Sequence, residues 1–147
     1  MAKYVRLDKI KATAHIESIV ATTDLLNGQF VELGDLQPDG EARKATPSGD
    51  VTKQLVFHAS NGLVYGDQEN ELDFVLKAGK TGRGYVLETG NIISIDDATL
   101  AVKDIVKPDA QGFVKADEAP TEGLRGQVIA VEMDAIAGRL AVIRVTA

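Results

Sequence analysis

The stretch that most resembles a chemical motif is GKTGRG, at residues 79–84. A phosphate-binding P-loop needs the spacing G-x-x-x-x-G-K-[ST], because backbone N–H groups ahead of the lysine wrap the phosphates. Counting back five positions from Gly79 reaches Phe74 instead of glycine. The dinucleotide fingerprint G-x-G-x-x-G fails as well, since Leu87 stands at its third glycine. Neither spacing supports nucleotide binding.

The residues after this stretch are also of the wrong kind for a P-loop. A P-loop leads from a strand into a helix, whereas GYVLETGNIISI is strand-like. We therefore predict a glycine-rich turn that feeds a strand starting near Tyr85. Lys80 and Arg83 are expected at the solvent side of that turn.

Four carboxylates alternate along one short stretch of the chain: Asp67, Glu69, Glu71 and Asp73. In an extended chain they would share one face, and such a group suits a hard cation such as calcium. An EF-hand loop is excluded, because Leu72 and Ala78 stand where its glycine and its closing glutamate belong. A solvated acidic loop leading into a short helix is the simpler interpretation, and a cation site of another kind is the alternative.

No other residues form a constellation for catalysis or for a cofactor. The two histidines, His15 and His58, lie in strand-like runs, and cysteine is absent, so the set of soft metal ligands is thin. No serine occupies a G-x-S-x-G elbow. The 22 acidic residues offer many pairs and single out none. We predict a protein that is not an enzyme, with no catalytic residue, no cofactor and no metal.

The elements that must position any site are predicted to be strands. Short runs rich in Val and Ile, bounded by Gly, Asn and Asp, are typical of strands. These runs are HIESIVA (15–21), QFVEL (29–33), LVFHA (55–59), GYVLE (84–88), NIISI (91–95), QVIAVEM (127–133) and RLAVIRV (139–145). The last two are expected to form a hairpin, whose loop includes Gly138, a residue that adopts positive φ at low cost.

Helical signals are few. Residues 69–79 predict about two helical turns that stop at Gly79, and residues 98–106 fit either a short helix or a strand. All four prolines lie in two polar segments, 34–50 and 107–123, which we predict to be long surface loops. Loops of that length in a small domain are often functional. The expected fold class is all-β with one or two short helices, as a small barrel or sandwich with long surface loops.

Length and charge limit the classes of function. The 147 residues suggest one domain, and no run approaches the roughly 20 apolar residues that span a bilayer. No signal peptide is expected, because charges recur through the first 20 residues. Residues 1–15 carry a net charge of +3, so the remainder of the chain carries −9. Such an acidic body argues against nucleic-acid binding, and neither a nucleic acid nor a membrane is expected as a partner.

Three phrases together resemble a known family. They are LLNGQFVELG (25–34), the polar DGE that follows at 39–41, and the block DFVLKAGKTGRGYVLETGNIISI (73–95). In this order they resemble the small head proteins that tailed phages encode beside the major capsid protein, described as decoration or cement proteins. The likeness covers residues 13–95 and consists of turn glycines and strand residues. Residues 96–147 lie outside it.

The resemblance implies a function without chemistry. Such proteins bind the outside of an assembled icosahedral head and clamp neighbouring subunits of the major capsid protein. They are often trimers at local threefold positions. The implied location is the outer surface of the virion, after synthesis in the host cytoplasm. The resemblance carries over no catalytic residue.

The N-terminus is the segment best suited to a capsid contact. Several decoration families use an N-terminal arm, and the basic charge of this chain is concentrated there. We predict a basic arm at 1–14 and a single β-rich domain at 15–147. The candidate capsid-binding residues are Lys3, Tyr4, Arg6, Lys9 and Lys11. The arm is either an extended strand that joins a capsid sheet or an edge strand of the domain itself.

Two other classes of function stay open. One is another structural module of the virion, such as a tail or head-completion protein, which would share the β-rich character. The other is a soluble ligand-binding β-domain unrelated to phages.

Overall fold

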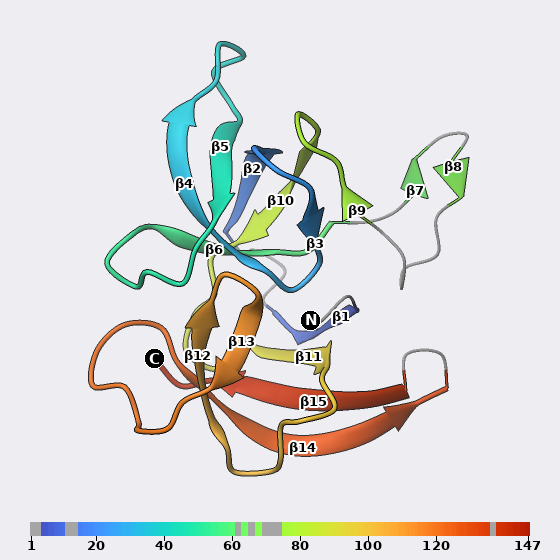
Figure 1. The fold of residues 1–147 in the computed structure, drawn as a ribbon, viewed down its shortest axis with the longest axis vertical. Coiled ribbons are helices and arrows are strands. Elements are labelled where there is room, and N and C mark those ends of the chain that lie inside the picture. The colour runs from blue at the N-terminus through green and yellow to red at the C-terminus, as the bar shows by residue number, and fades with distance from the viewer. Residues whose placement is uncertain (1–3, 11–14, 61–62, 65–66, 69–74, 136–137) are drawn as a thin grey trace.

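The computed structural model of the chain consists of strands, turns and loops (Figure 1). It describes residues 4–10, 15–60, 63–64, 67–68, 75–135 and 138–147, and no helix occurs among them. The predicted all-β class is confirmed. The strands are β1 (Val5–Lys9), β2 (Ile16–Ala21), β3 (Leu25–Leu26), β4 (Phe30–Leu36), β5 (Arg43–Pro47), β6 (Leu55–His58), β7 (Leu63–Val64), β8 (Asp67–Gln68), β9 (Val75–Leu76), β10 (Thr81–Tyr85), β11 (Ile92–Asp96), β12 (Ile105–Asp109), β13 (Gly112–Lys115), β14 (Gly126–Asp134) and β15 (Gly138–Val145).

Five strands close into a barrel in the order β10-β2-β5-β4-β6. β2 and β5 run parallel, and the other neighbouring pairs are antiparallel. Closure leaves these strands without free edges. The interior of so narrow a barrel needs small residues beside branched ones, and Ala21 and Ala45 are buried there with Ile19, Val31 and Val56.

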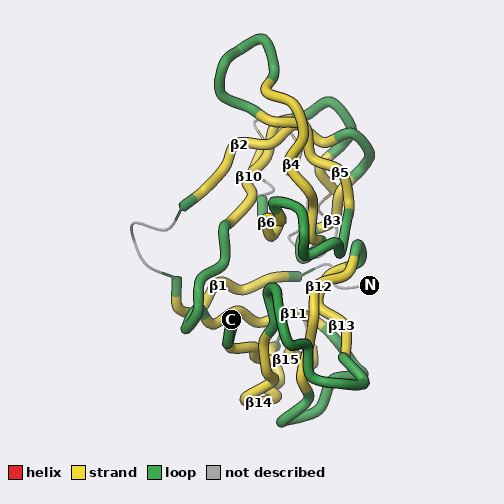
Figure 2. The backbone as a smooth tube through the Cα atoms, turned by 90° about the vertical axis from the view of Figure 1, so that its left-hand side faces the viewer, coloured by secondary structure: helices red, strands yellow, loops and turns green. Residues whose placement is uncertain are grey.

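The remaining long strands form a six-stranded antiparallel sheet in the order β1-β11-β15-β14-β12-β13. β14 and β15 pair along their whole length, from Gly126 opposite Val145 to Asp134 opposite Gly138. Gly138 has a φ of 81°, so the predicted hairpin and the role of its glycine are confirmed. The barrel and this sheet are stacked one above the other (Figure 2).

One hydrophobic cluster joins the barrel to the sheet. Phe30 of β4 and Phe57 of β6 contact Phe113 of β13, with ring centroids 4.8 and 6.1 Å from that ring. The Phe30 and Phe113 rings meet edge to face, the geometry that favours aromatic pairs. Ile93 and Ile143 of the sheet are buried in the same cluster. The two layers therefore share one core.

The NGQ sequence at residues 27–29 forms a buried turn between β3 and β4. Gly28 has a φ of 94°. The Asn27 side chain binds both backbone groups of Ser60, at 2.9 and 3.2 Å. Gln29 accepts a bond from Leu26 N and donates one to Ala110 O, between β12 and β13. Buried amides of this kind are stable only when paired, and here the pairing ties the barrel to the sheet.

The GKTGRG stretch is mostly strand, which corrects the predicted turn. The turn lies at residues 77–80, where Lys80 N bonds to Lys77 O and Gly79 has a φ of 84°. β10 then begins at Thr81 and ends at Tyr85, so the predicted strand at 84–88 was placed too late. A Cβ on Gly82 would lie 2.5 Å from Leu76 Cδ2, and one on Gly84 would lie 2.4 Å from Val56 Cγ2. These two glycines allow close packing and make no turn.

The segment 98–106, which fitted either a helix or a strand, contains no helix, and the helix predicted at 69–79 lies partly outside the described residues. Residues 69–74 lie outside them, and Val75–Leu76 is the strand β9, paired with β3. Leu76 is 6% exposed, because it packs into the barrel cluster. Residues 98–104 form bends and a turn, with Lys103 at a φ of 76°, a value that a helix excludes. Ile105 and Val106 begin β12, so the strand alternative holds for the end of this segment.

The two predicted loops are shorter than expected. The first, 34–50, contains the end of β4 and all of β5. The second, 107–123, contains the end of β12 and all of β13. Backbone pairing with neighbouring strands, rather than a hydrophobic period, holds β5 and β13 in place.

Candidate functional site

The N-terminal segment forms β1 at one edge of the six-stranded sheet. β1 pairs with β11, from Val5 opposite Ile95 to Lys9 opposite Ile92. Val5 and Leu7 pack against the shared core. This part of the arm is therefore attached to the rest of the chain by both backbone bonds and apolar contacts.

Arg6 is the centre of a polar network on this sheet. Its guanidinium binds the Asp8 carboxylate and lies 2.7 Å from Glu132 Oε2 on β14. Ser94, which is fully buried, donates a hydrogen bond to Asp8 and receives one from Arg6. The bonds to Asp8 and then to Glu132 raise the pKa of Arg6. The charge of Arg6 is thus paired with two carboxylates of the same chain, so Arg6 is a poor candidate for binding an anionic group of a partner.

The other candidate contact residues have different surroundings. Tyr4 is half-buried and pairs with Asp96 through its backbone, with N 2.9 Å from Asp96 Oδ1. Lys9 is exposed at the end of β1. Lys3 and Lys11 lie outside the described residues. Among the candidate residues that the structure describes, Lys9 is therefore the cation whose side chain is accessible to a partner.

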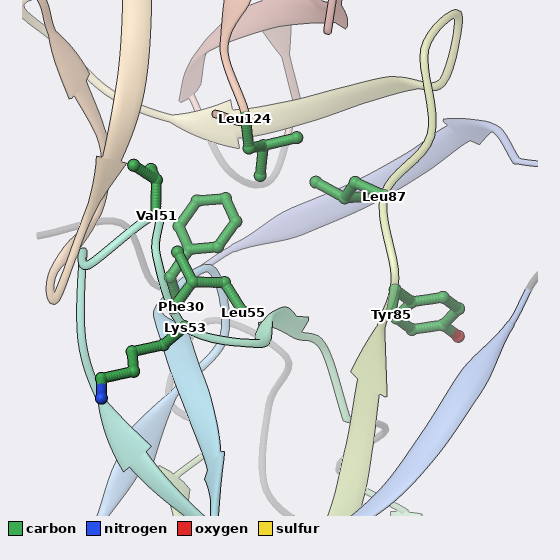
Figure 3. Close-up of a pocket in the computed structure, with 7 residues that line it drawn as sticks. All are labelled: Phe30, Val51, Lys53, Leu55, Tyr85, Leu87 and Leu124. Atoms are coloured by element: carbon green, nitrogen blue, oxygen red, sulfur yellow. The ribbon is translucent and has the colours of Figure 1, made fainter. Parts of the chain in front are cut away.

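A small cleft, called the apolar cleft below because most of its side chains are apolar, lies where the barrel meets the sheet. Its volume is about 130 Å³, and Phe30, Leu55, Leu87 and Leu124 line it together with Val51, Lys53 and Tyr85. In Figure 3 the leucine side chains gather around the Phe30 ring, whereas the Lys53 amine extends away from them. Such a lining can receive an apolar side chain.

A second hollow of about 460 Å³ adjoins the cleft, since Val51 and Leu124 line both. Its walls come from both segments that the sequence predicts to be functional loops. Gly49 and Asp50 stand on one side, and Pro108, Asp109 and Glu122 on the other. A Cβ on Gly49 would lie 2.7 Å from Asp109 Cα, so the glycine permits this close approach. Three of the charged residues that line the hollow are acidic, Asp50, Asp109 and Glu122, and one, Lys107, is basic.

His58 is the most chemically suggestive buried group. It is fully buried, with Nδ1 2.9 Å from Leu26 O and Nε2 2.8 Å from Ser60 Oγ. A carbonyl only accepts, so Nδ1 carries the proton and Nε2 accepts from the serine hydroxyl. Desolvation lowers the pKa of His58 and keeps it neutral. Neither cleft described above includes His58 or Ser60, and the pair fastens β6 to the NGQ turn.

The remaining polar candidates stay apart. Within the described residues, no group of three or more histidine, aspartate or glutamate side chains is placed to hold a metal ion. His15 lies 2.9 Å from Glu17 and is exposed. Of the acidic stretch 67–73, only Asp67 belongs to a described strand, β8, and Glu69, Glu71 and Asp73 lie outside the described residues. The described part of the chain also contains no helix of the length and apolarity needed to cross a membrane.

Sequence reasoning gave an edge strand as one of two possibilities for the N-terminus and singled out the two segments that line the hollow, although each contains a strand. It missed the cleft between barrel and sheet. Leu87 and Leu124 carried no signal as site residues, because single leucines in connections are ordinary. Comparison of the chain with protein-family models gives no match, and comparison with curated proteins gives none either.

Proposed function

We propose that the chain is a non-enzymatic decoration protein, which binds the outer surface of an assembled phage head and stabilises contacts between subunits of the major capsid protein. The observation that carries the proposal is the family resemblance of residues 13–95. The phrases that carry it correspond to the NGQ turn and to β9 and β10, whose side chains and glycines hold the barrel together. A partner that binds only the assembled state shifts the equilibrium toward that state.

Two surfaces are available for the capsid. One is the end of β1 with the exposed Lys9. The other is the acidic hollow between the 48–54 and 107–124 segments, next to the apolar cleft. The basic end of β1 suits an acidic patch of a capsid subunit, and we assign the main contact to it.

The test uses undecorated, expanded heads of the phage that encodes the chain. The purified protein is mixed with these heads, sedimented, and imaged by electron microscopy. Wild type is expected to co-sediment in hundreds of copies and to add density outside the shell. Lys9→Glu is expected to weaken binding by about tenfold. The measurement is made at low salt, because the contribution of charge to association falls with ionic strength. Lys44→Glu is the matched control, since Lys44 is an exposed lysine on the barrel strand β5.

Absence of added density with wild type would end the proposal. A copy number near a dozen would favour a connector or tail part instead. If Glu122→Lys weakens binding and Lys9→Glu does not, the main contact belongs to the hollow.

The apolar cleft favours a second candidate, a ligand-binding β-domain. A thermal-shift screen with nucleotides, calcium, oligosaccharides and small apolar acids tests it. Clear stabilisation by one class, together with no binding to heads, would replace the decoration proposal.

A further inference from the structure

The outer half of β14 is an open strand edge. β15 pairs with β14 on one side along its full length. On the other side, β12 pairs only with Gly126 and Gln127. Lys103 and Asp104 then bond to the backbone of Val128. Beyond that point, no described strand pairs with the second side of residues 129–134, and the β14 arrowhead lies at the outer margin of the molecule (Figure 1).

Apolar side chains are exposed along this edge. Met133 is 78% exposed and Ile129 is 43% exposed. Val102, beside Lys103, is 50% exposed. These are three of the six large hydrophobic residues that the described surface exposes. Natural edge strands usually avoid this combination, because unpaired backbone groups beside apolar side chains recruit another strand.

We propose that residues 129–133 pair antiparallel with the same segment of a second copy, around a two-fold axis at Val131. In that register Ile129 stands opposite Met133 of the other copy, and the reverse contact is identical. A two-fold interface must be self-complementary in this way. Glu132 stands opposite Ala130, so the register brings no like charges face to face.

The ends of the paired segments also match in charge. Asp134 of one copy then follows the paired segment and lies beside Lys103 of the other, whose backbone N–H already occupies the Val128 carbonyl. Lys103 is exposed, and its ammonium can reach the Asp134 carboxylate of the second copy. Met133 meets the exposed Val102 at the same place. The pairing thus covers all three exposed apolar residues and adds an ion pair at each end.

This assembly is a dimer, which departs from the trimer that the family resemblance implies. It is independent of the proposed function, because a monomeric variant that still coats heads would leave that proposal intact. Met133→Glu and Ile129→Lys each place a charge against an apolar side chain twice per dimer. In an equimolar mixture of the two variants, a mixed dimer sets the introduced glutamate opposite the introduced lysine and keeps one native contact between Ile129 and Met133.

Sedimentation equilibrium of the full chain over a range of concentrations tests the proposal. Wild type is expected to be a monomer–dimer mixture, each single variant to dissociate about tenfold more readily, and the mixture to recover dimers. Leu36→Lys, at a residue 58% exposed on the barrel, is the matched control and should dimerise as wild type does. Circular dichroism verifies folding, and Met133→Glu suffices if Ile129→Lys does not fold. The proposal would be overturned if the wild type is a monomer or a trimer at all concentrations. It would also be overturned if both variants dimerise as strongly as the wild type.

Discussion

At the scale of single residues, His58 shows how burial decides what a polar group does. The ring has both nitrogens paired, to Leu26 O and to Ser60 Oγ. Ser60 Oγ in turn accepts the N–H of Arg83. Protonation would turn Nε2 from an acceptor into a donor and would place a charge in the barrel, so the folded chain disfavours it.

This pairing predicts that the protein loses stability as the pH falls below about 6.5. The pKa of His58 is lowered in the folded chain from its ordinary value of 6.5. The unfolded chain therefore binds a proton that the folded chain does not, and the free energy of unfolding decreases with falling pH between the two pKa values. Urea unfolding at pH 7.5 and 5.5 measures the decrease.

The control is His58→Gln, which should be less stable at pH 7.5 and should show a much smaller decrease between the two pH values. His15→Gln alters the exposed histidine and should keep the wild-type decrease. Asp24, Asp39 and Asp50 have pKa values lowered from 3.8, so their contribution is lost only at more acid pH. Equal pH dependence in wild type and His58→Gln would refute this account.

Arg6 shows the limit of sequence reasoning at the same scale. Its position in a basic N-terminus predicted an outward contact. The folded sheet instead places Glu132, 126 positions later, within 2.7 Å of its guanidinium. The successive pairings of β1 with β11, β11 with β15 and β15 with β14 bring them together, and no local pattern records those pairings.

At the scale of elements, β10 contains glycine at positions where a side chain would not fit. Gly84 is buried between β2 and β6, and its position against Val56 and Ile19 allows the barrel to close. We expect Gly84→Ala to lower the free energy of unfolding by about 1–3 kcal/mol, the usual cost of overpacking. Gly34→Ala in β4 is the control, because its Cβ would meet its nearest atoms at 3.5 Å, an ordinary contact. Chemical denaturation compares the free energies of unfolding of the two variants. Equal values would show that the barrel accommodates the added methyl group at residue 84 without loss of stability.

The strands that were predicted correctly are those with enough Val and Ile to show a pattern. β2, β4, β6, β11, β14 and β15 all overlap the predicted runs. β5 has the sequence RKATP and buries only Ala45, and β10 has the sequence TGRGY with two glycines. Their strand character comes from neighbours on both sides, which are distant in sequence. The closure of the barrel depends on the same non-local pairs and was left open for that reason.

The candidate site divides in the same way. The long segments were recognisable from their prolines, glycines and charges. The cleft that they help to line was not, because it forms only where Leu124, Val51 and Leu87 meet around Phe30. The contacts among these side chains depend on how the sheet packs on the barrel.

At the scale of the whole molecule, the shared core predicts that barrel and sheet unfold as one unit. Phe113 of β13 is 3% exposed and contacts both Phe30 and Phe57 of the barrel. Removing its ring leaves a cavity at the junction, so Phe113→Ala should cost about 3–5 kcal/mol. Because the cavity borders both layers, hydrogen exchange should lose protection in β4 and β6 as well as in β11 and β15. Leu36→Ala, at an exposed barrel residue, should change stability by less than about 0.5 kcal/mol. Two separate thermal transitions, with the barrel still protected after the sheet has melted, would show instead that the layers are independent and that the aromatic contacts merely dock them.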